Sequence, residues 1–530
     1  MKTLYDSLLK YKDTNLKALY FENNEYTFKT LINNTQKMMS FFKEKGIKQN
    51  DVVTLVLPNI PSTIYCFYAL NAMGVILNII HPLTTFNNII SSMKQVGSKY
   101  AIVLATLYKD NEQDFNKSEF TFFFANPMED NNFILKNIFY IKYKKAKENS
   151  HLFLLDKYKK CIPNDFSINY IQNKTSIYLH SGGTTGTPKI ICLSNGAINN
   201  LASKVKNDIL KVDPTGKAML AVLPSFHGFG LAMGIHAPLS NGIVSALMIK
   251  FNTKKVVKWI NQNKVNYIIG VPLLYQKLLN DKDFLNCKLE NLEHCFIGGD
   301  NVSISLIERF NKLMKEKNSS NILLEGYGLT ETVTVCSVNT KDNFKIGSVG
   351  KPLGNIEFKI LDENYNQLNE NEIGEVYISG DTLMNGYLDD EISTSKTLIE
   401  INNKKYVKTG DLGYLDNDGF LFLKGRIKRM FKISGINVYP NEVEKIVTDL
   451  KDVYDASLEY FDNNGPHLNL YVIKNKNSTR TDSELIELIQ NRLKNQVLKY
   501  SLPKYIVFVD KFPKTNVGKI DHKAFNDINK

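Results

Sequence analysis

A glycine- and hydroxyl-rich segment, Ser181–Lys189, follows directly after an apolar run that ends at His180. Glycines allow the backbone to turn sharply and approach a ligand, so that several N–H groups can point at one anion. The residues that we expect to contact a polyphosphate are Ser181, Gly182, Gly183, Thr184, Thr185, Gly186, Thr187 and Lys189. The segment is not a Walker loop, because no Gly-Lys-Ser or Gly-Lys-Thr ends it. The alternative interpretation is a solvent-exposed turn.

Further segments follow along the chain in the order typical of one known family. They are Glu325–Glu331, Thr409–Asp411, Gly425–Lys428, Lys432–Gly435 and Gly518–Lys519, with weaker matches at Tyr26–Phe28 and Gly74–Pro82. Together with the glycine-rich segment they resemble the AMP-forming adenylating superfamily, which includes acyl-CoA synthetases, aryl-CoA ligases, adenylation domains and luciferases. The resemblance extends over nearly the whole chain and is greatest to acyl-CoA synthetases. It implies that ATP, Mg²⁺ and coenzyme A are used.

The resemblance places a nucleotide site around the segment Glu325–Glu331. The ring of Tyr327 can stack on adenine, since aromatic faces favour offset stacking. Thr330 can donate a hydrogen bond to the α-phosphate, and the Glu331 carboxylate is a hard oxygen ligand suited to Mg²⁺. The other nucleotide-binding residues that the resemblance implies here are Gly299, Asp300, Gly326 and Gly328.

Two charged residues complete the expected nucleotide site. Asp411 carries an acceptor-only carboxylate that can take both ribose hydroxyls. Arg426 is similar to the family's second contact to ribose and phosphate. On the residue type alone, an Asp in a Gly-Asp turn is usually structural, so these roles depend on the resemblance.

Lys519 is the catalytic lysine that the resemblance implies. A carboxylate that attacks the α-phosphorus concentrates negative charge as pyrophosphate leaves, and a positioned cation stabilises that transition state. The family alternates two orientations of a small C-terminal domain about a hinge, here at Lys428. One orientation brings in Lys519, and the other brings in a thiol-side segment with Lys432, Ser434 and Gly435.

The acyl pocket is expected near Pro224–Gly230, which resembles the family's segment beside the carboxylate and thiol tunnel. His227 is assigned a catalytic gating or orienting role, and its alternative is a hydrogen-bonded histidine at a strand end. The residues expected to form the pocket wall are Phe229, Gly230, Ile297, Gly328 and Val333. Adenylation domains for amino acids usually place an Asp near here, so its absence favours an acid without an α-amino group.

The expected function is ATP-dependent activation of a fatty or aryl acid to acyl-AMP, followed by thioester formation with coenzyme A. Little chain follows Lys519, so we expect the thiol to come from another molecule. Only fourteen residues separate Thr332 from Gly347, which leaves little space for the insertion that carrier-loading ligases tend to have. A stand-alone ligase that serves a separate acyl carrier protein remains the alternative, and a catalytically silent nucleotide-binding protein is a further one.

The elements that must position these residues alternate between strands and helices. Short β-branched or aromatic runs, each followed by a turn signal, predict strands at Val52–Leu57, Ser176–His180, Tyr267–Val271, Cys295–Ile297 and Asn321–Leu324. This alternation predicts an α/β fold in which helices cover largely parallel sheets. Residues 109–170 give no clear pattern.

The last hundred residues predict a compact α+β domain. Asn441 with Glu444 reads as a capping-box helix start, and Thr481 with Glu484 repeats it. A strand is expected over Leu468–Ile473 between them. We therefore expect an N-terminal AMP-binding domain over residues 1–425 and a small, mobile domain over residues 426–530.

Composition sets the remaining expectations. The net charge of +12 could indicate a polyanion-binding protein, but Lys is spread along the whole 530-residue chain, so we expect no nucleic-acid partner. No apolar run is long enough to span a bilayer. The six cysteines show no paired spacing: Cys66, Cys161, Cys192, Cys287, Cys295 and Cys336. With no secretory signal core at the start and no peroxisomal tripeptide at the end, we expect a cytoplasmic enzyme with reduced thiols.

Overall fold

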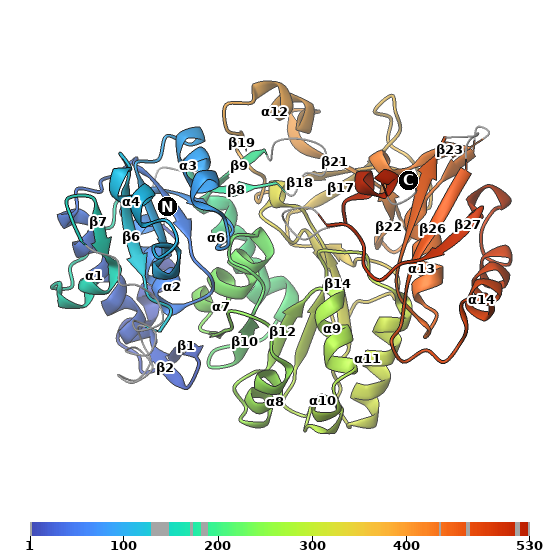
Figure 1. Cartoon of the computed structure of the whole chain (residues 1–530), viewed down its shortest axis with the longest axis horizontal. Helices are drawn as coiled ribbons and strands as arrows, with labels where there is room; N and C mark the ends of the chain where they lie inside the picture. The colour runs from blue at the N-terminus through green and yellow to red at the C-terminus, as the bar shows by residue number, and fades with distance from the viewer. Residues whose placement is uncertain are drawn as a thin grey trace.

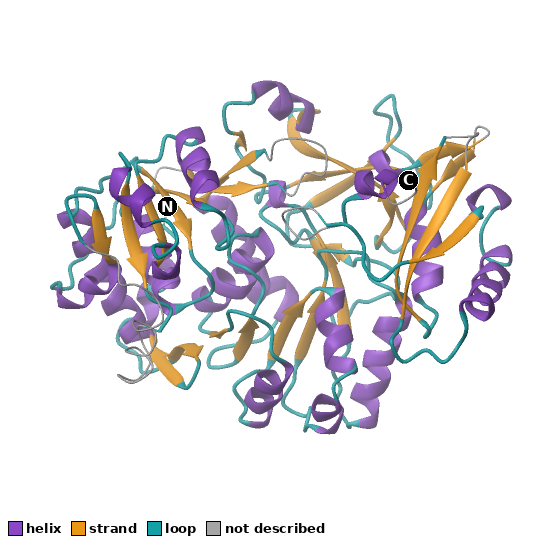
Figure 2. Ribbon diagram, viewed as in Figure 1, coloured by secondary structure: helices purple, strands orange, loops and turns teal. Residues whose placement is uncertain are grey.

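The computed structural model describes residues 3–128, 148–169, 173–181, 189–433, 436–462, 467–514 and 520–527. Strands and helices alternate along most of the chain (Figure 2). The N-terminal region, a central region around β14 (Leu323–Tyr327) and the C-terminal region lie side by side in Figure 1. The predicted α/β fold class is confirmed. In the described part of the chain, no helix combines the length and apolar character needed to cross a membrane.

The first sheet has eight strands and a parallel centre. In spatial order its strands are β19 (Gly386–Tyr387), β9 (Ile190–Ser194), β8 (Thr175–His180), β4 (Ile76–Ile79), β3 (Val52–Val56), β5 (Tyr100–Leu104), β6 (Thr121–Ala125) and β7 (Leu152–Leu154). The helices of this region are α1 (Phe28–Glu44), α2 (Pro61–Ala72), α3 (Phe86–Gln95) and α4 (Glu112–Lys117). The central strands are largely apolar because helices cover both faces of a parallel sheet, and the polar side chains of Thr54 and Asn78 hydrogen-bond to each other.

The second sheet has nine strands and carries the centre of the molecule. In spatial order its strands are β16 (Lys351–Pro352), β15 (Ser337–Val338), β14 (Leu323–Tyr327), β13 (His294–Ile297), β12 (Tyr267–Gly270), β10 (Ala218–Ala221), β11 (Val244–Leu247), β1 (Lys17–Phe21) and β2 (Asn24–Thr27). The six inner strands of this sheet, β14, β13, β12, β10, β11 and β1, run parallel to one another. β2 at one edge, and β15 and β16 at the other, pair antiparallel.

Alternate residues of this second sheet face two different hydrophobic cores. Met219, Ile269 and Phe296 pack toward the N-terminal region. On that side lie α6 (Asn195–Lys204), the π-helices η5 (Val205–Leu210) and η6 (Phe229–His236), and α7 (Ala237–Ser240). Ile268 and Ile297 pack on the opposite face. There lie α8 (Thr253–Asn261), α9 (Pro272–Leu279), α10 (Lys282–Asn286) and α11 (Ile304–Glu316). This division follows from the two-residue period of a strand.

All five predicted strands exist, with ends that differ by one to three residues. The largest difference is at β14, which begins at Leu323 rather than Asn321 and continues to Tyr327. The Asn321 side chain instead donates to the Cys295 sulfur over 3.2 Å, in a buried contact that lies outside the sheet ladder. The later start and end place Gly326 and Tyr327 at the carboxyl end of a strand.

A third, antiparallel sheet precedes the C-terminal region. Its strands are β17 (Glu357–Leu361), β18 (Gly374–Ser379), β20 (Leu398–Ile401), β21 (Lys404–Leu415) and β22 (Leu421–Arg426), with α12 (Glu391–Thr397) between β19 and β20. β21 and β22 pair so that Asp411 lies directly opposite Arg426.

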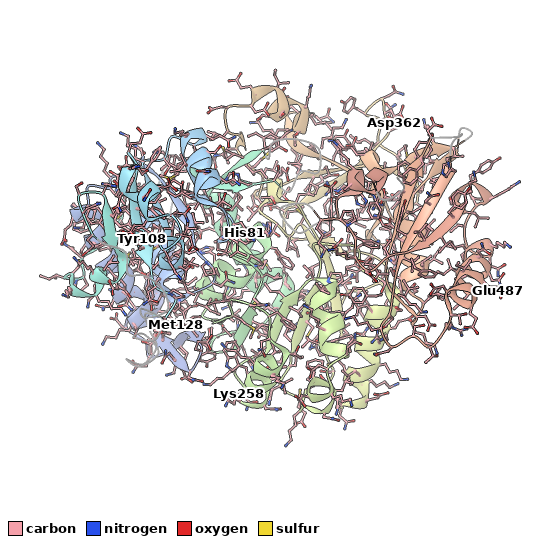
Figure 3. The ribbon with its side chains drawn as sticks, viewed as in Figure 1. His81, Tyr108, Met128, Lys258, Asp362 and Glu487 are labelled. Atoms are coloured by element: carbon pink, nitrogen blue, oxygen red, sulfur yellow. The ribbon has the colours of Figure 1, made fainter. Side chains whose placement is uncertain are left out.

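The C-terminal region has its own small sheet and core. Its elements are β23 (Phe431–Ile433), β24 (Ile436–Val438), α13 (Pro440–Thr448), β25 (Val453–Phe461), β26 (His467–Lys474), α14 (Asp482–Lys494) and β27 (Tyr505–Phe508). Both helices pack on β25 and β26 in one buried cluster. The predicted strand over Leu468–Ile473 and the Thr481–Glu484 capping box are confirmed. Glu487, labelled in Figure 3, marks α14 at the edge of the molecule.

The predicted helix start at Asn441 is wrong. The helix α13 begins one residue earlier, with Pro440 in its first turn and no side-chain cap. Proline is favoured at this position because its fixed φ suits the first turn and its missing N–H is not needed there. Glu444 is therefore not a capping residue; it pairs with Arg429 at 2.6 Å and accepts a hydrogen bond from the Leu458 backbone N–H over 2.8 Å.

Short helical turns connect these elements. They are η1 (Tyr5–Ser7), η2 (Leu9–Tyr11), η3 (Ala105–Leu107), η4 (Leu155–Lys160), η7 (Thr330–Thr332), η8 (Ile427–Arg429), η9 (Lys499–Ser501) and η10 (His522–Asp527).

Candidate active site

A cavity of about 2200 Å³ opens at the carboxyl ends of β10, β12, β13 and β14. Ligands of parallel α/β sheets bind at this edge. The predicted site residues that line it are Ser181, Lys189, His227, Phe229, Gly230, Ile297, Gly299, Asp300, Gly326, Tyr327, Gly328, Thr330, Glu331, Asp411, Arg426 and Lys428. The structure thus brings together residues from six separate stretches of sequence.

Other predicted residues lie elsewhere. Lys432 is exposed and lies outside the cavity wall. Val333 is buried and does not line the cavity either. The predicted residues outside the described part of the chain are Gly182, Gly183, Thr184, Thr185, Gly186, Thr187, Ser434, Gly435 and Lys519.

Asp411 is held from two sides at one wall of the cavity. The Tyr327 hydroxyl donates to its Oδ2 over 2.5 Å, and the Arg426 Nε lies 3.0 Å from its Oδ1. Burial raises the pKa of Asp411, while the charge of Arg426 and the hydrogen bond from Tyr327 oppose that rise. Each carboxylate oxygen has two lone pairs, so each can still accept one further hydrogen bond. The arrangement suits a diol such as the two hydroxyls of a ribose.

A strained turn lies beside this wall. Val333 has φ 68° and ψ −60°, and the Thr334 N–H donates to the Thr332 carbonyl across it, which makes a γ-turn. A β-branched residue rarely adopts positive φ, and such strain gathers at functional sites. The turn directs the Val333 side chain into the core, so Thr334 and Val335 form the cavity wall there instead. This corrects the prediction that placed Val333 in the acyl pocket.

Two glycines allow that turn to pack closely. A Cβ on Gly328 would lie 1.3 Å from the Thr334 carbonyl oxygen, and one on Gly228 would lie 2.2 Å from the Val333 carbonyl oxygen. Neither position can hold a larger residue unless the turn moves. Backbone contact, rather than flexibility, therefore explains the glycines at these two positions.

Glu331, Tyr387 and Lys189 lie together on one side of the cavity. The Tyr387 hydroxyl donates to the Glu331 Oε1 over 2.9 Å, and the Lys189 Nζ lies 4.6 Å from the centre of the Tyr387 ring. Ser181 and Lys189 pair with each other through two backbone-donated bonds of 2.9 Å. The two ends of the predicted phosphate segment therefore meet at the cavity, beside Glu331.

The residues present fit a magnesium ion. Among the described residues, no three His, Cys, Asp or Glu side chains gather as a metal site. Mg²⁺ needs no such cage, because it usually keeps several waters and binds one or two carboxylates together with substrate phosphates. Glu331, which accepts a hydrogen bond from Tyr387, is the residue that could supply such a carboxylate.

Sequence reasoning missed Glu325, a buried carboxyl on β14 that lines the cavity. Burial raises its pKa to about 7, and the charge of Lys445 on α13 opposes the rise. Among the described residues, no hydrogen-bond partner reaches its Oε2. Sequence reasoning also missed Tyr387, which lies 56 positions from its partner Glu331.

The C-terminal region closes one side of the cavity. The Ser305 backbone N–H donates to the Asp449 carboxylate over 3.0 Å, which joins α11 to the end of α13. Lys514 and Ile520 form a β-bridge with each other, and both line the cavity. Lys519 lies outside the described residues, but this bridge flanks it on the chain.

His227 lies in a row of three rings. The Phe226 ring is 4.4 Å from His227 and 4.5 Å from His81, centre to centre. His81 is labelled in Figure 3 and lies near the boundary between the N-terminal and central regions. Burial lowers the pKa of His81, so its ring favours the neutral form. The row positions His227 at the cavity wall, where η6 begins.

Comparisons with known proteins agree with this geometry. The profile of the family described as "AMP-binding enzyme" matches residues 10–388. A long-chain-fatty-acid–CoA ligase of Salmonella typhimurium is 27% identical over 94% of this chain and 90% of its own length. A 4-coumarate–CoA ligase of Nicotiana tabacum is also 27% identical, over 94% of this chain and 88% of its own.

Solved structures share the fold. The crystal structure of an anthranilate CoA ligase in complex with anthranoyl-AMP matches with a TM-score of 0.86 at 20% identity, over 100% of this chain and 97% of that one. An o-succinylbenzoate coenzyme A synthetase of Bacillus subtilis, in complex with ATP and magnesium, matches with a TM-score of 0.80 at 22% identity, over 99% and 100% of the two chains.

Proposed function

This chain belongs to the AMP-binding enzyme family, and we infer on that basis that it is an AMP-forming acid–thiol ligase. In the first step a carboxylate attacks the α-phosphorus of ATP, which forms acyl-AMP and releases pyrophosphate. In the second step the thiol of coenzyme A attacks the acyl carbon, which forms the thioester and releases AMP. The observation that carries this inference is the single cavity shared by Tyr327, Glu331, Asp411 and the two ends of the phosphate segment.

We propose that Tyr327 and Asp411 hold the nucleoside. The hydrogen bond between them fixes the Tyr327 ring, so that its face can stack on adenine. The free lone pairs of Asp411 accept from the ribose hydroxyls, and Arg426 remains beside them, close enough to contact a phosphate. Gly299 and Asp300 form the opposite wall of the adenine slot.

The triphosphate lies between Ser181, Lys189 and Thr330 in this proposal. Lys189 contributes a positive charge, and the Thr330 hydroxyl donates to the α-phosphate. Mg²⁺, when bound at Glu331, neutralises charge on the phosphate oxygens. Tyr387 keeps the Glu331 carboxylate directed into the cavity through its hydroxyl.

We propose that the C-terminal region moves between the two steps. Lys519 stabilises the negative charge that develops during adenylation, and the cavity-lining bridge of Lys514 and Ile520 is consistent with this orientation. A rotation about Lys428, whose helical turn connects the third sheet to the C-terminal region, then brings the side with Lys432, Ser434 and Gly435 to the cavity. The exposure of Lys432 outside the cavity is consistent with its use in the second step only. In this proposal the two domains are residues 1–425 and 426–530.

Coenzyme A is the acceptor that the chain supports best. The segment from Thr332 to Gly347 contains only the γ-turn, β15 and the loop after it, so it holds no added subdomain. We place the enzyme in the cytoplasm, because its six cysteines are free thiols and five of them are buried.

Pyrophosphate release from ATP, measured over a panel of fatty, aryl and amino acids with and without coenzyme A, tests this function. We expect acid-dependent pyrophosphate release that coenzyme A accelerates. In Asp411→Asn the rate of this release should fall by roughly a hundredfold, because the substitution weakens the ribose contact. Asp362→Asn is the matched control, because Asp362 is partly exposed and does not line the cavity (Figure 3). Acid-dependent pyrophosphate release whose rate coenzyme A does not change would contradict the assigned acceptor. Pyrophosphate release without any added acid would contradict the function.

A further inference from the structure

One arm of the cavity leads away from the charged residues. It is lined by Val205, Ile209 and Leu210 on η5, Met219 on β10, Met233 on η6 and Ile269 on β12. Each of these side chains is at most 5% exposed, and all belong to one hydrophobic core cluster. We call these six residues the apolar arm. Because they form both the cavity wall and the core, a ligand that enters here leaves water completely.

The apolar arm shares the cavity with the Pro224–Gly230 segment. The His227 N–H donates to the Pro224 carbonyl over 3.2 Å, and both residues line the cavity, as does Leu223. Met219 lies on β10, four residues before Leu223, which follows the end of that strand at Ala221. At about 3.3 Å per residue of extended chain, Met219 lies up to roughly 13 Å deeper than Leu223. Met233 likewise lies three residues further along η6 than Gly230. An extended alkyl chain of about ten carbons spans that depth, since C–C bonds of about 1.5 Å advance it by about 1.3 Å per carbon.

Both helical walls of the arm are π-helices. η5 and η6 each deviate from the α-helical spacing over their whole length. In a π-helix residues four and five apart lie on one face, which places Val205, Ile209 and Leu210 together. π-Helical turns are rare and occur frequently at functional sites. Because two π-helices line the same arm, we infer that its width serves a function and is not a packing defect.

The chemistry of the arm distinguishes among acids. None of its six side chains can donate a hydrogen bond, and the sulfurs of its two methionines are at most weak acceptors. His236, the one polar side chain of η6, already has both ring nitrogens within 3.2 Å of partners, Tyr68 and Asn199. A ring hydroxyl, an ammonium group or a second carboxylate would therefore enter unsatisfied, which is strongly unfavourable. An unsubstituted alkyl chain has no polar group that would be left without a hydrogen bond there, and the flexible side chains of Met219 and Met233 can adjust to its shape.

We propose that the acid is an unbranched fatty acid of medium or long chain, whose alkyl tail lies in the apolar arm. This inference rests on the proposed function, because it names the substrate class of the same site. The carboxylate lies beside His227, and the tail extends between η5, η6 and β10 past Ile269 toward Met219.

A series of saturated acids from four to fourteen carbons tests the proposal on the wild-type chain. We expect kcat/KM to rise roughly fourfold for each added methylene, the gain for burying one CH₂, and to level off at about ten to twelve carbons. Benzoate, 4-coumarate and malonate should each be used at least a hundredfold less well than dodecanoate. A flat series, or an aryl acid that equals dodecanoate, would overturn the proposal while acid-dependent pyrophosphate release still supported the function.

A variant pair tests the location of the tail. Ile209→Trp fills the arm from η5, and Asn207→Trp adds the same side chain to the exposed face of that helix. We expect Ile209→Trp to lower kcat/KM for dodecanoate by a hundredfold or more and for hexanoate by less than threefold, with Asn207→Trp close to wild type for both. Activity with hexanoate reports that the variant is folded. Equal losses for both acids in Ile209→Trp would overturn the placement, and should that variant fail to fold, the wild-type chain-length series decides.

No pyrophosphate release with any acid in either panel would contradict the proposed function itself. The arm would then be tested by binding of a non-hydrolysable acyl-adenylate analogue. We expect the dodecanoyl analogue to bind at least tenfold more tightly than the benzoyl one, and the reverse order would overturn the inference.

Discussion

The Tyr327 hydroxyl donates a 2.5 Å hydrogen bond to the Asp411 carboxylate, across 84 positions of sequence. The bond connects the end of β14 in the second sheet to β21 in the third. It also fixes the aromatic ring and the carboxylate that we propose to hold adenine and ribose. The two sheets thus meet at the proposed nucleoside site.

Tyr327→Phe should raise the KM for ATP by roughly tenfold or more, because a hydrogen bond to a charged group contributes about 1.5–3 kcal/mol. The acid KM should change little. Tyr406→Phe is the matched control, since it removes a 2.7 Å bond to the Glu357 carboxylate in the same sheet but outside the cavity wall. Equal ATP KM values for Tyr327→Phe and wild type would contradict the assigned site.

Glu331→Gln should increase the Mg²⁺ concentration for half-maximal pyrophosphate release by about tenfold or more, because an amide replaces the only carboxylate we assign to the metal. Tyr387→Phe should give a smaller increase, since it removes the donor that orients Glu331. Glu308→Gln, on the exposed face of α11, serves as the control. A Mg²⁺ titration in which Glu331→Gln and Glu308→Gln coincide would exclude the metal role.

Lys519→Ala should separate the two half-reactions. We expect acid-dependent pyrophosphate release to fall by about a hundredfold or more, as for loss of a group that stabilises developing charge. Thioester formation from supplied acyl-AMP should stay within about threefold of wild type. Lys523→Ala removes an exposed lysine four residues away and should behave as wild type. Equal losses in both half-reactions would argue against a role confined to adenylation.

Glu325 should make stability depend on pH. Burial raises its pKa from an ordinary value near 4.5 to about 7. Between these values the folded chain keeps a proton that the unfolded chain releases, so stability falls as pH rises through this window and is lowest above about 7. Glu325→Gln removes this dependence.

The melting temperatures of wild type and Glu325→Gln at pH 5 and pH 8 check this prediction. The free energy of unfolding of Glu325→Gln should increase relative to that of the wild type as pH rises, by an amount on the order of 1–3 kcal/mol. Asp455, whose pKa burial also raises to about 7, is present in both proteins, so its effect cancels in the comparison. A difference in melting temperature that is the same at both pH values would contradict the burial of an ionisable Glu325.

Sequence reasoning could predict the residues whose chemistry is local. Asp411 and Tyr327 lie in short motifs that resemble those of a known family, so the resemblance was enough to suggest a role for each. Tyr387 and Glu325 were missed because their significance arises only in three dimensions. Tyr387 approaches Glu331 through the pairing of β19 with β9, and the charge of Lys445 on α13 acts on Glu325 only in the folded chain.

The fold was predictable to a similar degree. Apolar runs identified the strands because a parallel sheet buries both faces of each strand. The helix start at Asn441 failed because a polar pair can imitate a capping box, whereas Pro440 sets the first turn. The place of Val333 could not be foreseen, since a γ-turn at a β-branched residue contradicts its own local preference.

The most direct test of the central claim follows an oxygen atom. A carboxylic acid labelled with ¹⁸O in both oxygens is incubated with the enzyme, ATP and coenzyme A. The masses of AMP, pyrophosphate and the thioester are then measured by mass spectrometry. If the carboxylate attacks the α-phosphorus and the thiol then releases AMP, one ¹⁸O appears in AMP and the other stays in the thioester carbonyl. AMP without label, or label in pyrophosphate or inorganic phosphate, would contradict acyl-adenylate formation by this enzyme.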